Sequence, residues 1–256
     1  MTDAELLAAL PGWAFAFALV LCRCSAAIML LPGLGEVDPP PTIRAGLALA
    51  VSMLLVPGVA EMVPAVPVGW GGGGMIAAEL LVGASLGWLA RLPALALSMA
   101  GAVASTMMGL SSVVQPDPAL GGQSSTVAKL FGLMAPVLVL STGMYALPLR
   151  ALAGSYQLFP PGAVMPAGAI AESIEQAVAA SLALALQLSA PFVLAGLVVQ
   201  VGLGLLARLV PQLQVFTVAV PGQILGGVVL LGLVAAPMVS VWVDATTAAW
   251  SLLPGH

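Results

Sequence analysis

The apolar stretch of residues 75–110 restricts the fold of this chain more than any other feature of the sequence. It has 36 residues, so a straight helix of that length, with a rise of ~1.5 Å per residue, would span about 54 Å. The hydrocarbon core of a bilayer is about 30 Å thick and is crossed by about 20 helical residues. The stretch is therefore too long for one straight crossing, and it contains no loop that would allow two.

Apolar sequence dominates the rest of the chain as well. Hydrophobic residues make up 61% of the 256 residues and charged residues 6%, against about 45–50% and about 25% in a soluble domain. Five further apolar stretches are 6–34, 43–60, 127–152, 178–210 and 215–243. We therefore predict an all-α membrane-associated protein with about six apolar segments. The chain has only 6 Lys and Arg residues and a net charge of −4. Binding of nucleic acid phosphates needs a dense basic surface, so nucleic acid is excluded as a partner.

Five prolines lie well inside four of these stretches. A proline within a helix removes one backbone donor and clashes with the preceding turn, at a cost of about 3 kcal/mol. Membrane helices tolerate single prolines, but five of them predict segments that are kinked and divided into shorter, angled helices. The freed backbone groups cannot face lipid, so close protein neighbours or a wet cavity are expected. The five residues are Pro93, Pro136, Pro191, Pro221 and Pro237.

Charged residues inside the apolar stretches also require neighbours. Arg23 and Arg91 lie where an arginine facing lipid costs at least ~2.5 kcal/mol, so each needs a protein partner or a path to water. In the segment ELLVGASLGWLAR, Glu79, Gly83, Gly87 and Arg91 recur every four residues and share one helix face, where small residues let another backbone approach. We predict that Arg23 and this face take part in packing between subunits. For Glu79, an ion pair, with Arg91 nearby, or a carboxylate at a helix end is favoured over a proton relay.

The residues that could support catalysis or bind a metal are few. Cys22 and Cys24 are two residues apart and would point to nearly opposite sides of a helix, so they are interpreted as free buried thiols. The only histidine is His256, which leaves no metal site. Glu79 and Asp244 are the main acidic candidates, and neither has a second carboxylate near it in the sequence. The sequence therefore predicts no enzyme, no metal and no cofactor.

The longest polar stretch, SSVVQPDPALGGQSST at residues 111–126, lies near the midpoint of the chain. Its prolines stiffen the backbone, its glycines permit a sharp turn, and its serines and glutamines tolerate water. Composition alone favours an ordinary solvent-facing connection between two helices.

Three stretches resemble the FliR family, the flagellar biosynthetic membrane proteins, together with their counterparts in injectisome type III secretion. The segment GLSSVVQPDPALGGQSSTVAKLF (109–131) resembles the mid-chain signature of the family. GLGLLARLVPQLQVFTVAVPGQ (202–223) is similar to its C-terminal signature, and RCSAAIMLLPGLGEVDPPPTIRAGLALA (23–50) to its N-terminal pattern. Four positions depart from the pattern: Ser112 and Pro116 replace bulky aromatics, and Gln214 and Gln223 stand where Asn and Lys are common.

The resemblance implies a non-enzymatic, single-copy subunit of a type III protein export gate in the bacterial inner membrane, at the flagellar basal body. Its expected partners are FliP, FliQ and FlhB-like subunits, membrane lipid, and the unfolded proteins that are exported. It further implies kinked helical hairpins within a helical multi-subunit assembly. Residues 1–170 would form a FliP-like half with a central loop at 111–126, and residues 171–256 a FliQ-like hairpin.

The resemblance also implies roles for particular residues. The mid-chain loop would be a plug that closes the export channel until a substrate passes. The residues expected to form the plug are Ser111, Ser112, Val113, Val114, Gln115, Pro116, Asp117, Pro118, Gly121, Gly122 and Ser124. Three residues of the C-terminal signature are expected to take part in packing between subunits, namely Arg208, Pro211 and Gln212.

Three alternatives remain open at the level of the sequence. An injectisome subunit is the nearest, although the stretch QVFTVAVP (214–221) favours a flagellar one. A small-solute secondary transporter would also use broken helices, but it predicts inverted repeats that the two halves do not display. A membrane enzyme would depend on Glu79 or Asp244.

Overall fold

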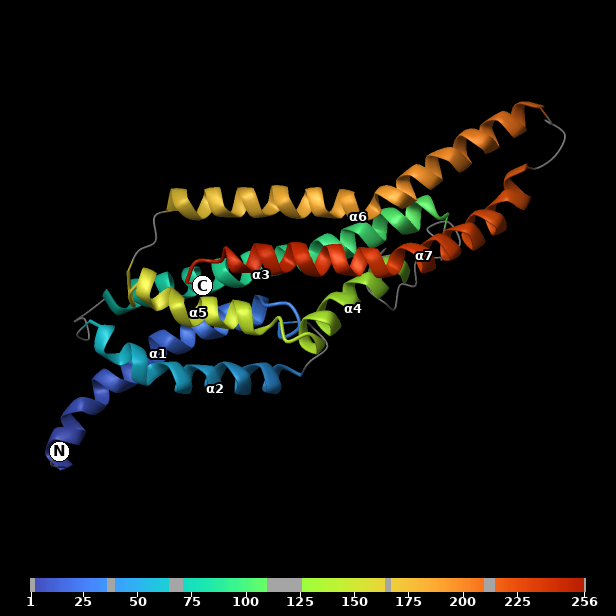
Figure 1. The fold of residues 1–256 in the computed structure, drawn as a ribbon. Helices are drawn as coiled ribbons and strands as arrows, with labels where there is room; N and C mark the ends of the chain where they lie inside the picture. The colour runs from blue at the N-terminus through green and yellow to red at the C-terminus, as the bar shows by residue number, and fades with distance from the viewer. Residues whose placement is uncertain are drawn as a thin grey trace. The chain divides into compact units, whose positions relative to one another are not determined.

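The computed structural model describes residues 3–35, 40–64, 71–109, 126–163, 167–209 and 215–255. These residues are mostly helical, and no strand occurs among them (Figure 1). The prediction of an all-α protein is confirmed. The elements are α1 (Asp3–Leu30), α2 (Pro41–Val59), η1 (Ala60–Met62), α3 (Gly71–Met107), α4 (Thr126–Ser141), α5 (Ala146–Leu158), α6 (Ala167–Leu209) and α7 (Val215–Ser251).

Each apolar stretch of the sequence lies mostly within helix, although α6 and α7 extend beyond their stretches and the stretch 127–152 is divided between α4 and α5. In the described part of the chain, 5 helices are long and apolar enough to cross a membrane, and a sixth span results if α4 and α5 count together. That pair is bent by 71°, and Gly143 lies in the bend with φ +76°, a conformation that glycine adopts without strain. The five are Leu10–Leu30, Pro41–Met62, Gly71–Met107, Gly168–Leu209 and Ala219–Ser251.

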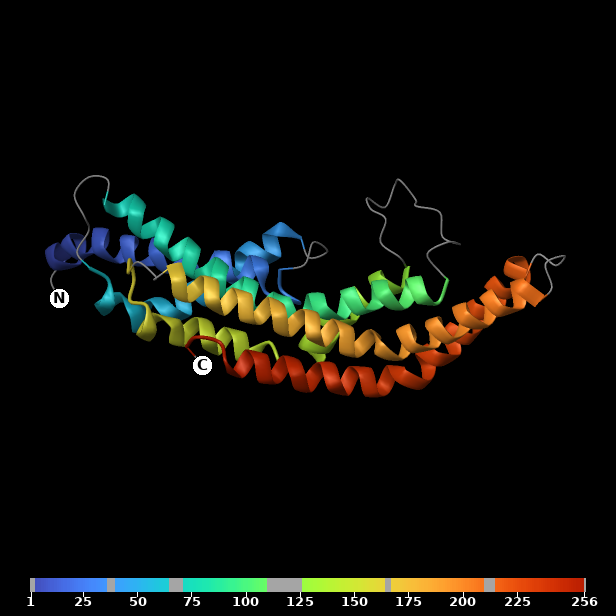
Figure 2. The ribbon, with the colours of Figure 1, turned by 90° about the horizontal axis from the view of Figure 1, so that it is seen from above.

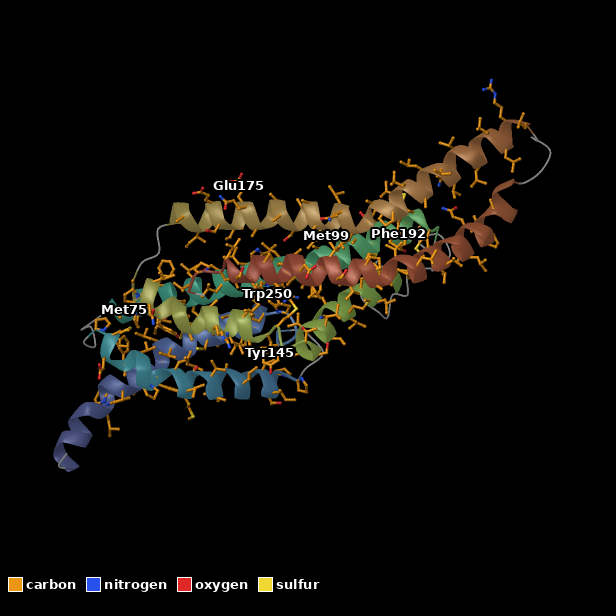
Figure 3. All side chains as sticks on the ribbon, viewed as in Figure 1. Met75, Met99, Tyr145, Glu175, Phe192 and Trp250 are labelled. Carbon is orange, nitrogen blue, oxygen red and sulfur yellow. The ribbon has the colours of Figure 1, made fainter. Side chains whose placement is uncertain are left out.

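The prolines singled out in the sequence lie inside helices that continue on both sides of them. Helices α3, α6 and α7 have 37, 43 and 37 residues, so these segments stay continuous instead of being divided at their prolines. Helix α6 changes direction in its middle (Figures 1 and 2), near Phe192, which follows Pro191 and is labelled in Figure 3. The difference has a simple physical reason: a proline removes only one backbone donor, and packed neighbours can offset a bend without ending the helix.

The contacts between residues divide the chain into two compact units. Unit 1 comprises Met1–Leu92, Pro136–Val178 and Thr247–His256, and unit 2 comprises Pro93–Ala135 and Ala179–Thr246. Two of these boundaries fall at prolines inside helices. The halves implied by the family resemblance, 1–170 and 171–256, are a different division, based on likeness to other subunits, and they stay a prediction.

Unit 1 is built around α1. Helices α1 and α2 lie side by side (Figure 1), and the side chains of Leu19, Val20 and Ile28 on α1 are fully buried. Helix α5 contributes Leu152 and Tyr156 to the same core. This core surrounds two charged residues, which form the site described below.

Unit 2 has an apolar core formed by the second part of α3 together with parts of α4, α6 and α7. A Cβ added at Gly101 of α3 would lie 2.7 Å from the ring of Phe131 on α4, so this glycine makes room for the ring. Phe192 of α6 and Trp242 of α7 are also buried. The other faces of α6 and α7 expose many large apolar side chains, among them Leu186, Leu194, Val198, Leu225 and Leu233. Such faces need lipid or further protein to cover them.

Candidate functional site

A buried ion pair joins α1 to α3 within unit 1. The Arg23 Nε atom donates a hydrogen bond of 2.7 Å to Glu79 Oε2, and Arg23 Nη2 donates one of 2.9 Å to Glu79 Oε1. The exposed fractions of the two side chains are 0% and 1%. This two-pronged geometry is the strong form of a charged hydrogen bond, because the planar guanidinium matches the carboxylate.

Further polar groups complete the surroundings of the pair. Arg23 Nη1 donates to Ser155 Oγ at 3.1 Å, and Arg23 Nη2 donates to the carbonyl of Phe159 at 2.9 Å. The backbone N–H of Gly162 donates to Glu79 Oε1 at 2.8 Å. Both charges are therefore hydrogen-bonded on more than one side, which is what a charge removed from water requires.

An aromatic ring covers the arginine. The guanidinium carbon of Arg23 lies 4.0 Å from the centre of the Tyr156 ring, a cation–π contact that is favourable when both groups are desolvated. The Tyr156 hydroxyl lies 3.8 Å from Cys24 Sγ. Cys22 and Cys24 are both free thiols, as expected, but only Cys24 is fully buried and Cys22 is half-buried.

The small residues predicted on one face of α3 are the points where α1 approaches. A Cβ added at Gly83 would collide with the backbone carbonyl of Arg23, and one added at Gly87 would lie 2.6 Å from the carbonyl oxygen of Ala27. The helices therefore come close enough for backbone to touch backbone, which only glycine allows. Glu79, Gly83 and Gly87 are thus brought together with Arg23 inside one chain. Their predicted role in packing between subunits stays a prediction.

The other residues predicted to take part in subunit packing or to form the plug do not belong to this ion-pair site. Arg91 is half-buried in α3, in the same unit as Glu79; twelve residues of helix separate the two by about 18 Å, too far for an ion pair. Arg208 lies exposed in the last turn of α6. Pro211 and Gln212 lie outside the described residues, and so does every residue predicted to form the plug, from Ser111 to Ser124.

The structure does describe the end of the helix that leads into the mid-chain stretch. Helix α3 ends at Met107, and Gln223 of α7 donates a hydrogen bond of 2.7 Å from its Nε2 atom to the carbonyl of Met107. The sequence had marked Gln223 only as a departure from the family pattern. The sequence shows that a glutamine at this position can donate a hydrogen bond, but it does not show which group accepts that bond.

Two tryptophans that the sequence did not single out donate to backbone carbonyls of α3. In unit 1, Trp250 Nε1 donates to the carbonyl of Ala90 at 3.0 Å (Figure 3). In unit 2, Trp242 Nε1 donates to the carbonyl of Pro93 at 2.9 Å. Both indoles are fully buried. Their spacing of eight residues puts them on one face of α7, a signal that could have been read from the sequence.

The described residues offer little for catalysis. Within the described ranges, no three His, Cys, Asp or Glu side chains come together in a way that could hold a metal ion. Both oxygens of Glu79 already accept hydrogen bonds, and Asp244 is exposed on α7 in unit 2, whereas Glu79 lies in unit 1. The arrangement is typical of a structural ion pair that fixes two helices.

Comparison with known proteins gives a match over most of the length. The model of the family described as bacterial export proteins, family 1, matches residues 14–249. Flagellar biosynthetic protein FliR of Caulobacter vibrioides is 34% identical over 228 residues, which cover 89% of this chain and 91% of that protein. The chain belongs to the FliR family of bacterial export proteins. The resemblance drawn from three stretches of sequence is thereby confirmed.

Other known proteins match over similar lengths. Flagellar biosynthetic protein FliR of Bacillus subtilis is 30% identical over 219 residues, 84% of each chain. Yop proteins translocation protein T of Yersinia pestis is 27% identical over 211 residues, 80% of each chain. The relatives thus carry two kinds of name, flagellar biosynthesis and Yop protein translocation, and each match extends over most of both chains.

Proposed function

We propose that this chain is a structural and gating subunit of a flagellar type III protein export channel in the bacterial inner membrane, and that it is not an enzyme. The observation that carries the proposal is the 34% identity to a flagellar FliR protein over nine-tenths of both chains. The long apolar helices support a membrane location. The fully hydrogen-bonded Glu79 supports a structural role for this carboxylate.

The partners proposed are FliP-, FliQ- and FlhB-like subunits, with unfolded proteins as the cargo. Support comes from the exposed apolar faces of α6 and α7, which are broad enough to need covering. Purification of the chain from its own host should recover it together with those subunits. A chain that is isolated alone and moves a small solute by itself would contradict the proposal and support a secondary transporter.

The gating role is assigned to the mid-chain stretch. Residues 111–124 combine two prolines, a Gly-Gly pair and several small polar residues, a composition that suits a shaped loop in an aqueous channel. The family resemblance supports the proposal that this stretch closes the channel as a plug. Deletion of Gly121 and Gly122 should then leave the assembled complex intact and raise ion leakage across the membrane. Unchanged conductance in cells that contain the assembled variant complex would contradict the plug role.

An injectisome subunit is the second candidate, and the match to the Yersinia protein favours it. Identity to the flagellar FliR proteins of Caulobacter vibrioides and Bacillus subtilis, 34% and 30%, exceeds the 27% identity to the Yersinia protein and supports the first candidate. The two differ in a simple experiment in the host organism. Deletion of the gene should abolish motility and the secretion of flagellar filament protein if the chain is flagellar. Loss of effector secretion with normal motility would establish the injectisome instead.

A further inference from the structure

The end of α3 is held by two other helices of unit 2. A Cβ added at Gly196 of α6 would lie 3.0 Å from the sulfur of Met107, and one added at Gly227 of α7 would lie 2.5 Å from Cγ of Met108. These two glycines therefore make room for two consecutive methionine side chains. Gln223 lies four residues before Gly227 and so on the same face of α7. We call Gly196, Gln223 and Gly227 the α3 seat.

The hydrogen bond from Gln223 is accepted by a backbone carbonyl at the C-terminal end of α3. The last four carbonyls of an α-helix have no partner within the helix, and Met107 is the last residue of α3. The Nε2 atom of Gln223 supplies a donor at 2.7 Å from the Met107 oxygen. The side chain from α7 thus caps α3 at the place where the helix ends.

Gly109, which follows Met108, has a backbone conformation that ends the helix. Gly109 has φ +74°, the left-handed conformation that ends many helices and that glycine adopts without strain. A Cβ at Gly109 would lie 3.4 Å from the amide carbon of Gln223. Gln223 therefore binds the last turn of α3 and lies beside Gly109, two residues before the mid-chain stretch begins.

We infer that Gln223 is a positioning residue: through the α3 seat, the hairpin of α6 and α7 holds the end of α3 and sets the point from which the mid-chain stretch departs. The consequence for channel closure rests on the proposed function of that stretch. A donor is the property required at position 223, because the group it binds is a carbonyl oxygen. Lysine keeps a donor of comparable reach, whereas leucine and glutamate supply none.

The position of α3 against α7 can be measured without reference to channel closure. Cysteines introduced by Met108→Cys and Gly227→Cys would have adjacent Cβ atoms, since a Cβ at Gly227 would lie 2.8 Å from that of Met108. A disulfide needs about 3.5–4.5 Å between its Cβ atoms, so α3 and α7 must move apart by about 0.7 Å or more before the bond can close. The rate of disulfide formation in the membrane-embedded export complex, mapped by mass spectrometry, reports how often the end of α3 occupies its seat. Removal of a hydrogen bond to a partly buried carbonyl such as that of Met107 shifts such an equilibrium by about three- to tenfold.

The experiment compares Gln223→Leu and Gln223→Glu with Gln223→Lys, each alone and with the cysteine pair. Gln223→Leu and Gln223→Glu should slow disulfide formation several-fold and raise ion leakage, while the amount of assembled complex stays the same. Gln223→Lys should leave both measurements close to those of the unchanged protein. Rescue by lysine distinguishes a required donor from a merely well-packed side chain.

The other possible results bear on the role of Gln223 and on the plug role separately. An unchanged disulfide rate in Gln223→Leu would overturn the inference, whatever the leakage. A slower rate without leakage would overturn it too, if deletion of Gly121 and Gly122 does cause leakage. If that deletion causes none, the proposed plug role fails, and the disulfide rates of the leucine and lysine variants alone decide whether Gln223 positions α3.

Discussion

Arg23 and Glu79 are 56 residues apart in the sequence and are joined by two hydrogen bonds of 2.7 Å and 2.9 Å in the interior of unit 1. The pair connects α1 to α3 and also reaches α5 through Ser155. A buried pair of this kind contributes little net stability compared with well-packed apolar residues, but removal of one partner leaves an uncompensated charge. Removal of both partners together should therefore cost less stability than the two single losses would suggest.

Glu79→Leu should therefore destabilise the protein strongly, by about 3–5 kcal/mol in the free energy of unfolding. The double variant Arg23→Met with Glu79→Leu should lose less than the sum of the two single variants, because neither charge is then left alone. The measurement is denaturant unfolding of the purified complex in detergent, followed by circular dichroism. Additive losses in the double variant would show that the two residues do not interact.

Gly83→Ala tests the close approach of α1 and α3. The new Cβ would meet the backbone carbonyl of Arg23, so the helices must separate, at a cost of about 1–3 kcal/mol. Gly74→Ala in the same helix is the matched control. Among the described residues, a Cβ at Gly74 would meet no atom outside the backbone of its own helix within 4 Å. Equal unfolding free energies for the two variants would count against the contact.

Trp242→Phe tests the indole hydrogen bond in unit 2. The phenyl ring lacks the N–H that reaches the carbonyl of Pro93 and also fills less space, so a loss of about 1–3 kcal/mol is expected. Trp88→Phe is the control, because Trp88 is 42% exposed. Its stability should stay within about 0.5 kcal/mol of the parent, as for most surface substitutions. A loss at Trp88 as large as that at Trp242 would refute the special role of the buried indole.

Two buried hydroxyls give opposite expectations. Within the described ranges, the Thr246 hydroxyl has no hydrogen-bond partner, so Thr246→Val should leave the stability unchanged or raise it, since no bond is lost.

Ser155 accepts a hydrogen bond from Arg23 and donates one to the carbonyl of Leu152. Ser155→Ala should cost about 1.5–3 kcal/mol, the range for bonds to charged groups. Thermal unfolding of the two variants side by side checks the difference, and a reversed order would disprove it.

Much of the fold could be predicted from local patterns. The long apolar stretches predicted helices, and their low charge predicted a membrane protein, because burial in an apolar medium depends on composition and length. The four-residue spacing of Glu79, Gly83 and Gly87 predicted a helix face that another backbone could approach. The cost of an arginine in an apolar stretch predicted that Arg23 has a partner.

The identity of that partner was decided by the tertiary structure. The sequence suggested an ion pair of Glu79 with Arg91, which lies on the same helix face, but twelve helical residues hold them about 18 Å apart. The partner is Arg23, from a helix that comes much earlier in the chain. Likewise, nothing local relates Gln223 to Met107, which is 116 residues away.

The sequence by itself thus determined the helices, their apolar character, the small-residue face of α3 and the family to which the chain belongs, because these follow from residue types and their spacing. Only the tertiary structure decided that Arg23 meets Glu79 and that Gln223 caps α3. The physical reason is that a contact between distant residues depends on how whole helices pack together, and the periodicity of one helix does not specify its neighbour.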